Sequence, residues 1–244
     1  MLALPKLSIV ITVTDASHRV ASVIDEASRA LNHATLLDFI VVDDATDDTT
    51  QRELAALADA DERVRLYRQP TAMGTDAALW QAAELALGEW IVTLDAYGRD
   101  DPHGVPEMLC DAQQYGLTLV EGIPLAPRCR WKRTACRIAR SVGIELTDSI
   151  KCGLRLVRKD ALSALPPIER LHRFLPLLIR RGGGRIGTYR VNPRHAIEAP
   201  GMTLRQWLLR TLGDIRDWLG MYWLSRRWRP RRTLDRGRSR ALAR

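Results

Sequence analysis

The chain has 244 residues, of which 46% are hydrophobic and 27% charged, a composition typical of a globular protein with one large core. Its net charge of +8 is concentrated at the C-terminus, because residues 226–244 hold nine arginines and one aspartate, which accounts for the whole excess. No stretch reaches the roughly 18–20 apolar residues of a membrane-spanning helix, and the apolar N-terminus has no charged n-region, so neither an integral membrane protein nor a signal peptide is expected.

The first half of the chain alternates apolar runs with segments of helical periodicity. The apolar runs predict strands over Leu7–Val13, Phe39–Val42, Val64–Tyr67, Trp90–Leu94 and Leu117–Glu121. One helix is expected to cap at Asp48 or Thr49, and another to cover Gly74–Ala86. This alternation predicts an α/β fold with a doubly wound, mostly parallel sheet.

Carboxylates follow two of the predicted strands directly. Asp43 and Asp44 end the second strand, and Asp95 ends the fourth, with Asp100 and Asp101 close behind. Ligands of open α/β sheets bind at the carboxyl ends of the strands. The first two aspartates can also be read as solvated turn residues that cap the next helix. The position of Asp95 at the end of another strand of the same sheet favours a nucleotide site.

Several segments resemble family 2 glycosyltransferases, particularly the dolichol- and undecaprenyl-phosphate sugar transferases. The run GEWIVTLDAYGRDDP over Gly88–Pro102 is similar to the family's L-D-A-D-x-Q-D-P signature, and IVVDDATDDTT is similar to I-V-V-D-D-G-S-T-D-G-T. Asp148–Arg158 resembles D-x-x-x-G-F/L-R-x-x-R, and His172–Pro176 resembles H-R-F-x-P. The resemblance implies a GT-A type domain over residues 1–200.

The resemblance also implies a nucleotide-sugar site at the strand ends and at the start of the helix at Gly74. The residues implied are Thr12, Thr14, Asp15, Asp43, Asp44, Gly74, Asp95 and Ala96. The small residue Gly74 would let the helix begin close to the donor diphosphate, whose charge a helix N-terminus favours.

Catalytic roles are implied for Asp95, Arg99, Asp100 and Asp101. Asp100 or Asp101 would orient the donor sugar or act as the base for a hydroxyl acceptor. Two further residues, Arg155 and Arg173, are candidates to bind the donor diphosphate or an acceptor phosphate, because a guanidinium matches phosphate oxygens. The alternative for both is a surface arginine on an amphipathic helix.

The chain departs from the family signature where a cation is normally held. The signature's second aspartate falls on Tyr97 and its glutamine on Arg99, which leaves Asp95 as the one metal-ligand candidate and disfavours Mg²⁺ or Mn²⁺. The P-x-Y-N-E that normally follows the first strand is also missing. Two interpretations remain: a transferase in which Arg99 replaces the cation, or a catalytically inactive GT-A module that acts as a membrane-associated binding or regulatory partner.

The C-terminal region carries an apolar stripe and then a basic run. Residues 201–225 are expected to form an amphipathic helix, and residues 226–244 an Arg-rich, disordered tail. The helix would either dock on the domain or lie with the tail, as residues 204–244, on an anionic membrane surface. We expect a cytoplasmic protein, peripheral on the inner face of the cytoplasmic membrane, with a nucleotide sugar and a lipid-linked acceptor as partners and no nucleic acid.

Overall fold

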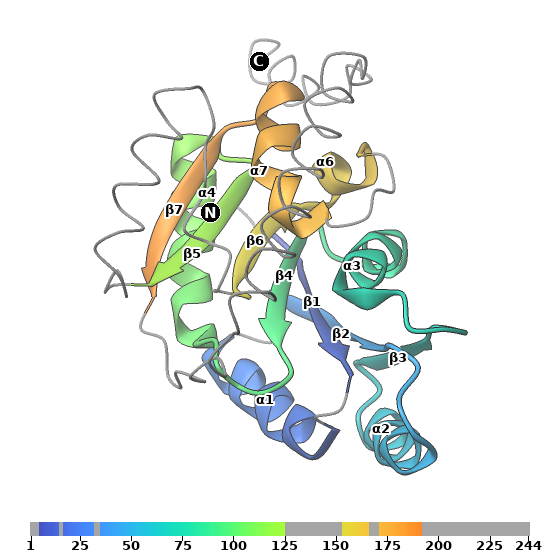
Figure 1. Ribbon diagram of the computed structural model, residues 1–244. Helices are drawn as coiled ribbons and strands as arrows, with labels where there is room; N and C mark the ends of the chain where they lie inside the picture. Colours follow the sequence, from blue (N-terminus) through green and yellow to red (C-terminus); the bar gives the residue numbers. More distant parts are fainter. Residues whose placement is uncertain (1–4, 15–16, 32–34, 125–152, 166–170, 192–244) are drawn as a thin grey trace, which may run out of the picture.

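A single sheet forms the centre of the protein in the computed structural model, which describes residues 5–14, 17–31, 35–124, 153–165 and 171–191 (Figure 1). Seven strands lie in the order β3-β2-β1-β4-β6-β5-β7. They are β1 Leu7–Val13, β2 Leu36–Asp43, β3 Val64–Arg68, β4 Trp90–Asp95, β5 Leu119–Pro124, β6 Arg155–Arg158 and β7 Ile186–Val191. Only β6 runs antiparallel to its neighbours, so the prediction of a mostly parallel α/β sheet is confirmed.

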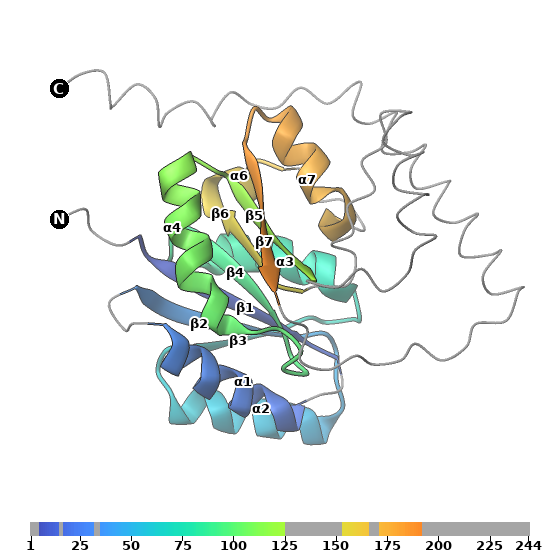
Figure 2. The same cartoon turned by 90° about the vertical axis from the view of Figure 1, so that its left-hand side faces the viewer.

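Helices cover both faces of this sheet (Figure 2). One face carries α1 (Ser17–Ala30), α2 (Asp48–Ala60), the short η1 (Pro102–Gly104) and α4 (Val105–Tyr115), and the other carries α3 (Gly74–Leu85), α6 (Lys159–Ser163) and α7 (Leu171–Arg181). Successive strand residues point to opposite faces. Val92 therefore packs in the core under α1 and α4, and its neighbour Ile91 packs in the core under α3 and α7. The result is three layers.

Of the predicted boundaries that differ from the structure, two have an identifiable local reason. The N-cap of α2 is Asp47, whose side chain accepts from the Thr50 amide at 2.8 Å, and neither Asp48 nor Thr49 takes that place. The strand expected from Leu117 begins at Leu119, because Gly116 ends α4 in the left-handed region (φ 59°) and the Leu117 amide still bonds the Ala112 carbonyl.

The strand β6 was not predicted, since RLVR is short and flanked by charge. It places Arg155 in the sheet, so the surface-helix alternative for that residue is wrong. Asp15 and residues 201–244 lie outside the described residues. Within the part of the chain that is described, no helix combines the length and apolarity needed to cross a membrane.

Backbone and side chains pack closely at the edge of the sheet formed by the amino ends of the parallel strands. A Cβ on Gly88 would lie 2.6 Å from the Leu7 carbonyl carbon, so only glycine fits there. The Gly88 amide donates to Ser8 Oγ at 2.8 Å, and that hydroxyl donates to the buried Asp38. Arg65 donates to Asp38 at 3.2 Å, which ties β1, β2 and β3 together.

Candidate functional site

The carboxyl edge of the sheet brings several predicted site residues together. In the strand register Thr12 lies beside Asp95 on one side and Val42 on the other, and Val13 lies beside Asp43. The carboxylates at the ends of β2 and β4 therefore flank the end of β1, as parallel pairing requires.

Asp95 and Arg99 form a bidentate ion pair at the end of β4. Arg99 Nε donates to Asp95 Oδ2 at 2.8 Å, and Nη2 donates to Oδ1 over a shorter distance. The same Oδ2 accepts from the backbone amides of Tyr97 (3.0 Å) and Arg99 (3.3 Å). Both carboxylate oxygens, which would ligate a cation in the family pattern, are thus engaged by the guanidinium. The side-chain hydrogen bonding to Asp95 raises the pKa of Arg99 above its ordinary value.

Tyr97 fixes the plane of this guanidinium. The Arg99 Cζ atom lies 4.9 Å from the centre of the Tyr97 ring, within the range of a cation–π contact. Arg19, on α1, reaches the Tyr97 carbonyl at 3.5 Å, so the loop also rests on α1. The Arg99 side chain remains 40% exposed, against 13% for Asp95, and keeps part of its surface for a ligand.

Asp100 is buried and holds backbone in place. Its Oδ2 accepts from the Asp95 amide at 3.1 Å, and a Cβ on Gly153 would lie only 2.5 Å from that oxygen. The Gly153 carbonyl accepts from Thr93 Oγ1 at 2.5 Å. The glycine of the predicted D-x-x-x-G motif therefore lets the chain pass directly against the Asp95–Asp100 turn.

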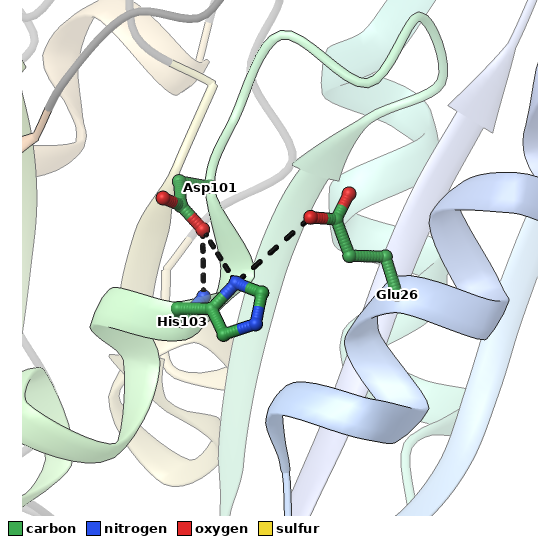
Figure 3. A group of neighbouring side chains, drawn as sticks. All are labelled: Glu26, Asp101 and His103. Carbon is green, nitrogen blue, oxygen red and sulfur yellow. Dashed lines mark hydrogen bonds and ion pairs between the residues drawn. The ribbon is translucent and has the colours of Figure 1, made fainter.

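The Asp101 side chain points toward His103 of η1, across from Glu26 of α1 (Figure 3). It caps η1 by accepting from the His103 amide at 3.0 Å, and its Oδ1 lies 2.9 Å from His103 Nδ1. Glu26 Oε1, from α1, lies 3.9 Å from the same ring nitrogen.

Asp43 opens onto a hollow between α2 and β3. Its side chain is 1% exposed and lies 3.9 Å from the Nε of Arg68, which is 59% exposed. Asp43 Oδ1 accepts from the Thr46 amide at 2.8 Å. Arg68, Gln51 and Arg52 line the hollow with Asp43. Sequence reasoning missed Arg68, although its place at the end of the third strand, level with Asp43, was a usable signal.

Asp44 occupies the start of α3. Its Oδ1 accepts from the amides of Met73 (2.7 Å) and Gly74 (3.0 Å), and Gly74 takes a positive φ of 81° to present its amide. With its amide group turned to satisfy both partners, Gln69 donates to Asp44 at 2.7 Å and accepts from Ala78 at 3.1 Å. The helix start expected to attract a diphosphate is thus already held by a carboxylate of the chain.

The remaining predicted residues are spread around the edge. Arg155 is buried beside Glu121 of β5, with Nε and Oε1 3.3 Å apart. Ala96 packs its side chain into the core, and Thr14 is exposed after β1. Arg173 lies in α7, and its side chain is outside the description.

The model of the family described as Glycosyl transferase family 2 matches residues 8–141. Dodecaprenyl-phosphate galacturonate synthase of Rhizobium johnstonii is 23% identical over 181 residues, covering 70% of this chain and 53% of that protein. Undecaprenyl-phosphate 4-deoxy-4-formamido-L-arabinose transferase of Yersinia pestis is 28% identical over 182 residues, covering 71% and 55%. The chain spans about half the length of these curated relatives.

Two solved structures share the fold. One is glucosyl-3-phosphoglycerate synthase from Mycobacterium tuberculosis in complex with Mn²⁺ and UDP-glucose, with a TM-score of 0.64, 20% identity, and coverage of 91% of this chain and 79% of that one. The other is a mannosyltransferase from Pyrobaculum calidifontis in complex with GDP-mannose and Mn²⁺, with a TM-score of 0.62, 17% identity, and coverage of 80% and 58%. At these identities the likeness establishes the architecture alone.

Proposed function

The chain belongs to glycosyl transferase family 2, with a GT-A type fold, and from this premise we propose that it transfers a sugar from a nucleotide-sugar donor to a polyprenyl phosphate or another membrane-associated acceptor. We further propose that the Arg99 guanidinium takes the place of the divalent cation. The acceptor class is supported by the names of the curated relatives, which act on dodecaprenyl and undecaprenyl phosphate.

The Asp95–Arg99 pair is the observation that carries this proposal. In the family signature, two carboxylates and a divalent cation sum to zero charge. Asp95, the neutral Tyr97 and the cationic Arg99 also sum to zero. A donor diphosphate would therefore meet a positive group backed by a carboxylate in both cases. The substitutions at positions 97 and 99 compensate each other electrostatically.

The geometry leaves Arg99 able to bind phosphate. A guanidinium has five N–H groups, and Asp95 takes one from Nε and one from Nη2. Three N–H groups remain for the diphosphate oxygens. Asp95 and the Tyr97 ring fix the plane of the guanidinium before the donor arrives, and preorganised positive charge of this kind stabilises the leaving diphosphate in the transition state.

A phosphate acceptor suits the carboxylates around the site. Such an acceptor is ionised at neutral pH and needs no general base. Asp100 is buried against the Asp95 amide, and Asp101 faces His103, so neither is placed as an open base beside Asp95. Asp43 with Arg68 would bind the nucleotide in the hollow beside β3.

The test is donor binding with and without metal. Calorimetric titration of the full chain with UDP- and GDP-sugars is expected to give binding in EDTA that Mn²⁺ does not strengthen. Arg99→Gln should weaken this binding at least about tenfold, since a charge-assisted contact to phosphate is lost. Arg158→Gln is the matched control, because Arg158 is also 40% exposed and also pairs with an aspartate through Nε and Nη2.

A second variant separates the two interpretations of the sequence. Tyr97→Asp combined with Arg99→Gln restores the family signature, and donor binding should then return only when Mn²⁺ is present. Absence of nucleotide-sugar binding in the wild type, in both EDTA and Mn²⁺, would instead favour the inactive GT-A module.

Membrane attachment through residues 204–244 is a separate proposal, supported by the charge of the tail. The full chain should co-sediment with vesicles containing phosphatidylglycerol and be released by high salt. Equal co-sedimentation with purely zwitterionic vesicles would contradict an electrostatic anchor.

A further inference from the structure

We propose that Glu26, Asp101 and His103 form a binding site for a divalent transition metal of the Zn²⁺ class, distinct from the donor site at Asp95 (Figure 3). The site would join α1 to the loop that follows β4. It does not depend on the proposed transferase activity, because its ligands are not the residues that would contact the donor.

The three ligand atoms are spaced as one small cation requires. Glu26 Oε1, Asp101 Oδ1 and His103 Nδ1 all lie within 4.8 Å of one another. Two ligands of a tetrahedral Zn²⁺, at bond lengths near 2.1 Å, are about 3.4 Å apart. The Asp101–His103 separation of 2.9 Å and the Glu26–His103 separation of 3.9 Å lie on either side of that value. A change of about 0.5 Å in each of these two separations would bring it to the tetrahedral value.

The ligand types select the metal. An imidazole with two carboxylates is a typical Zn²⁺ donor set, whereas Mg²⁺ and Ca²⁺ prefer oxygen ligands alone. To bind through Nδ1, His103 must be neutral with its proton on Nε2, so the ion would replace the Asp101–His103 hydrogen bond. The side chains are 25%, 32% and 59% exposed for Glu26, Asp101 and His103, which leaves room for water to complete the coordination.

The surroundings of the three ligands carry further negative charge. The nearby Tyr189 hydroxyl donates to Glu107 Oε2 at 2.6 Å. This hydrogen bond, burial and the charges of Glu107, Asp111 and Asp101 together raise the pKa of Tyr189 to about 12. Of these carboxylates, Glu107 and Asp111 are not among the proposed ligands, and their negative charge would attract a cation.

An ion at this site would act on the loop that carries Arg99. Asp101 and His103 follow Arg99 by two and four residues, and Glu26 belongs to α1, against which η1 packs. The Asp95–Arg99 pair already fixes the start of this loop. Coordination at Asp101 and His103 would fix its end as well. A bound ion should therefore stabilise the folded chain by mass action.

The experiment is a titration of the metal-stripped full chain with ZnCl₂, with variants at each ligand. Glu26→Gln, Asp101→Asn and His103→Gln keep the size of each side chain, and asparagine can still cap η1. Outer-shell partners alone are worth about 10–100-fold in metal affinity, so each variant should bind one Zn²⁺ at least about tenfold more weakly. Glu84→Gln, at an exposed position of α3, is the matched control and should bind as the wild type does.

The ring nitrogens of His103, followed by ¹⁵N NMR, give a readout that does not depend on affinity. Zn²⁺ should shift the His103 Nδ1 resonance in the wild type, and MgCl₂ at the same concentration should not. Zinc binding that is unchanged in both His103→Gln and Glu26→Gln would place the ion elsewhere and overturn the proposal, as would a wild type that binds none.

Discussion

Two arginine–aspartate pairs of the same form lie at opposite edges of the sheet. Arg99–Asp95 ends β4, whereas Arg158–Asp160 follows β6 level with Trp90, where β4 begins. Both arginines are 40% exposed, but the aspartates differ, at 13% for Asp95 and 45% for Asp160. Asp95 also receives two loop amides, and its arginine stacks on Tyr97. The two pairs therefore differ in the burial of the aspartate and in the number of further contacts, and not in the ion pair itself.

The largest expected difference between the two pairs is in catalysis. Arg99→Gln should lower kcat/KM for sugar transfer to undecaprenyl phosphate about 100–1000-fold, as the loss of a preorganised oxyanion partner does. Arg158→Gln should leave it unchanged. The assay uses the donor found by titration, in EDTA. Equal losses in the two variants would mean that the arginines act through stability, which thermal unfolding would reveal.

One glycine near each arginine–aspartate pair, Gly153 and Gly88, allows the two ends of the sheet to be compared again. In Gly153→Ala the new methyl would lie 2.5 Å from Asp100 Oδ2 and displace the turn that carries Asp95, so kcat/KM should fall about 100-fold. In Gly88→Ala the methyl would meet Leu7 backbone at 2.6 Å, which should lower the free energy of unfolding by about 1–3 kcal/mol. Measured at a temperature where both variants are folded, only Gly153→Ala should show the catalytic loss.

The smallest effect is expected away from both arginine–aspartate pairs, at Tyr189 in β7. Its pKa is raised from 10.0 to about 12 in the folded chain, so the neutral phenol stabilises the fold fully below pH 10, and this contribution is lost as the pH rises toward 12. Tyr189→Phe should lower the free energy of unfolding by about 1 kcal/mol at pH 8 and flatten its decline above pH 10. Denaturant titrations across this range test it. A decline that is identical in Tyr189→Phe would assign the pH dependence to other groups.

Local chemistry made much of this fold predictable. The β-branched run of β1 predicts a buried strand without knowledge of its neighbours, and its bounds, Leu7–Val13, are confirmed. Parallel pairing then implies that Asp43 and Asp95 share one edge. The contact between Arg99 and Asp95 is local in the sequence, because the two residues are four positions apart.

The features that were missed depend on distant partners. Arg155 is buried because Glu121 lies opposite it in β5, and nothing in RLVR reveals that pairing. Asp44 accepts hydrogen bonds from the amides of Met73 and Gly74, which follow it by 29 and 30 residues. The Glu26–Asp101–His103 group likewise needs α1 and η1 to be packed together before its members meet.

The Arg99 guanidinium also bears on how a reaction cycle would end. A dissolved ion can leave with the nucleoside diphosphate and be replaced from the cellular pool, but a guanidinium is covalently attached to the chain. Asp95 offers a way around this, because its carboxylate balances the charge of the guanidinium and keeps two of its N–H groups, so that only the remaining three would hold the product. Under the proposed function, this pair would stay closed while the product leaves. Turnover would then be insensitive to manganese supply.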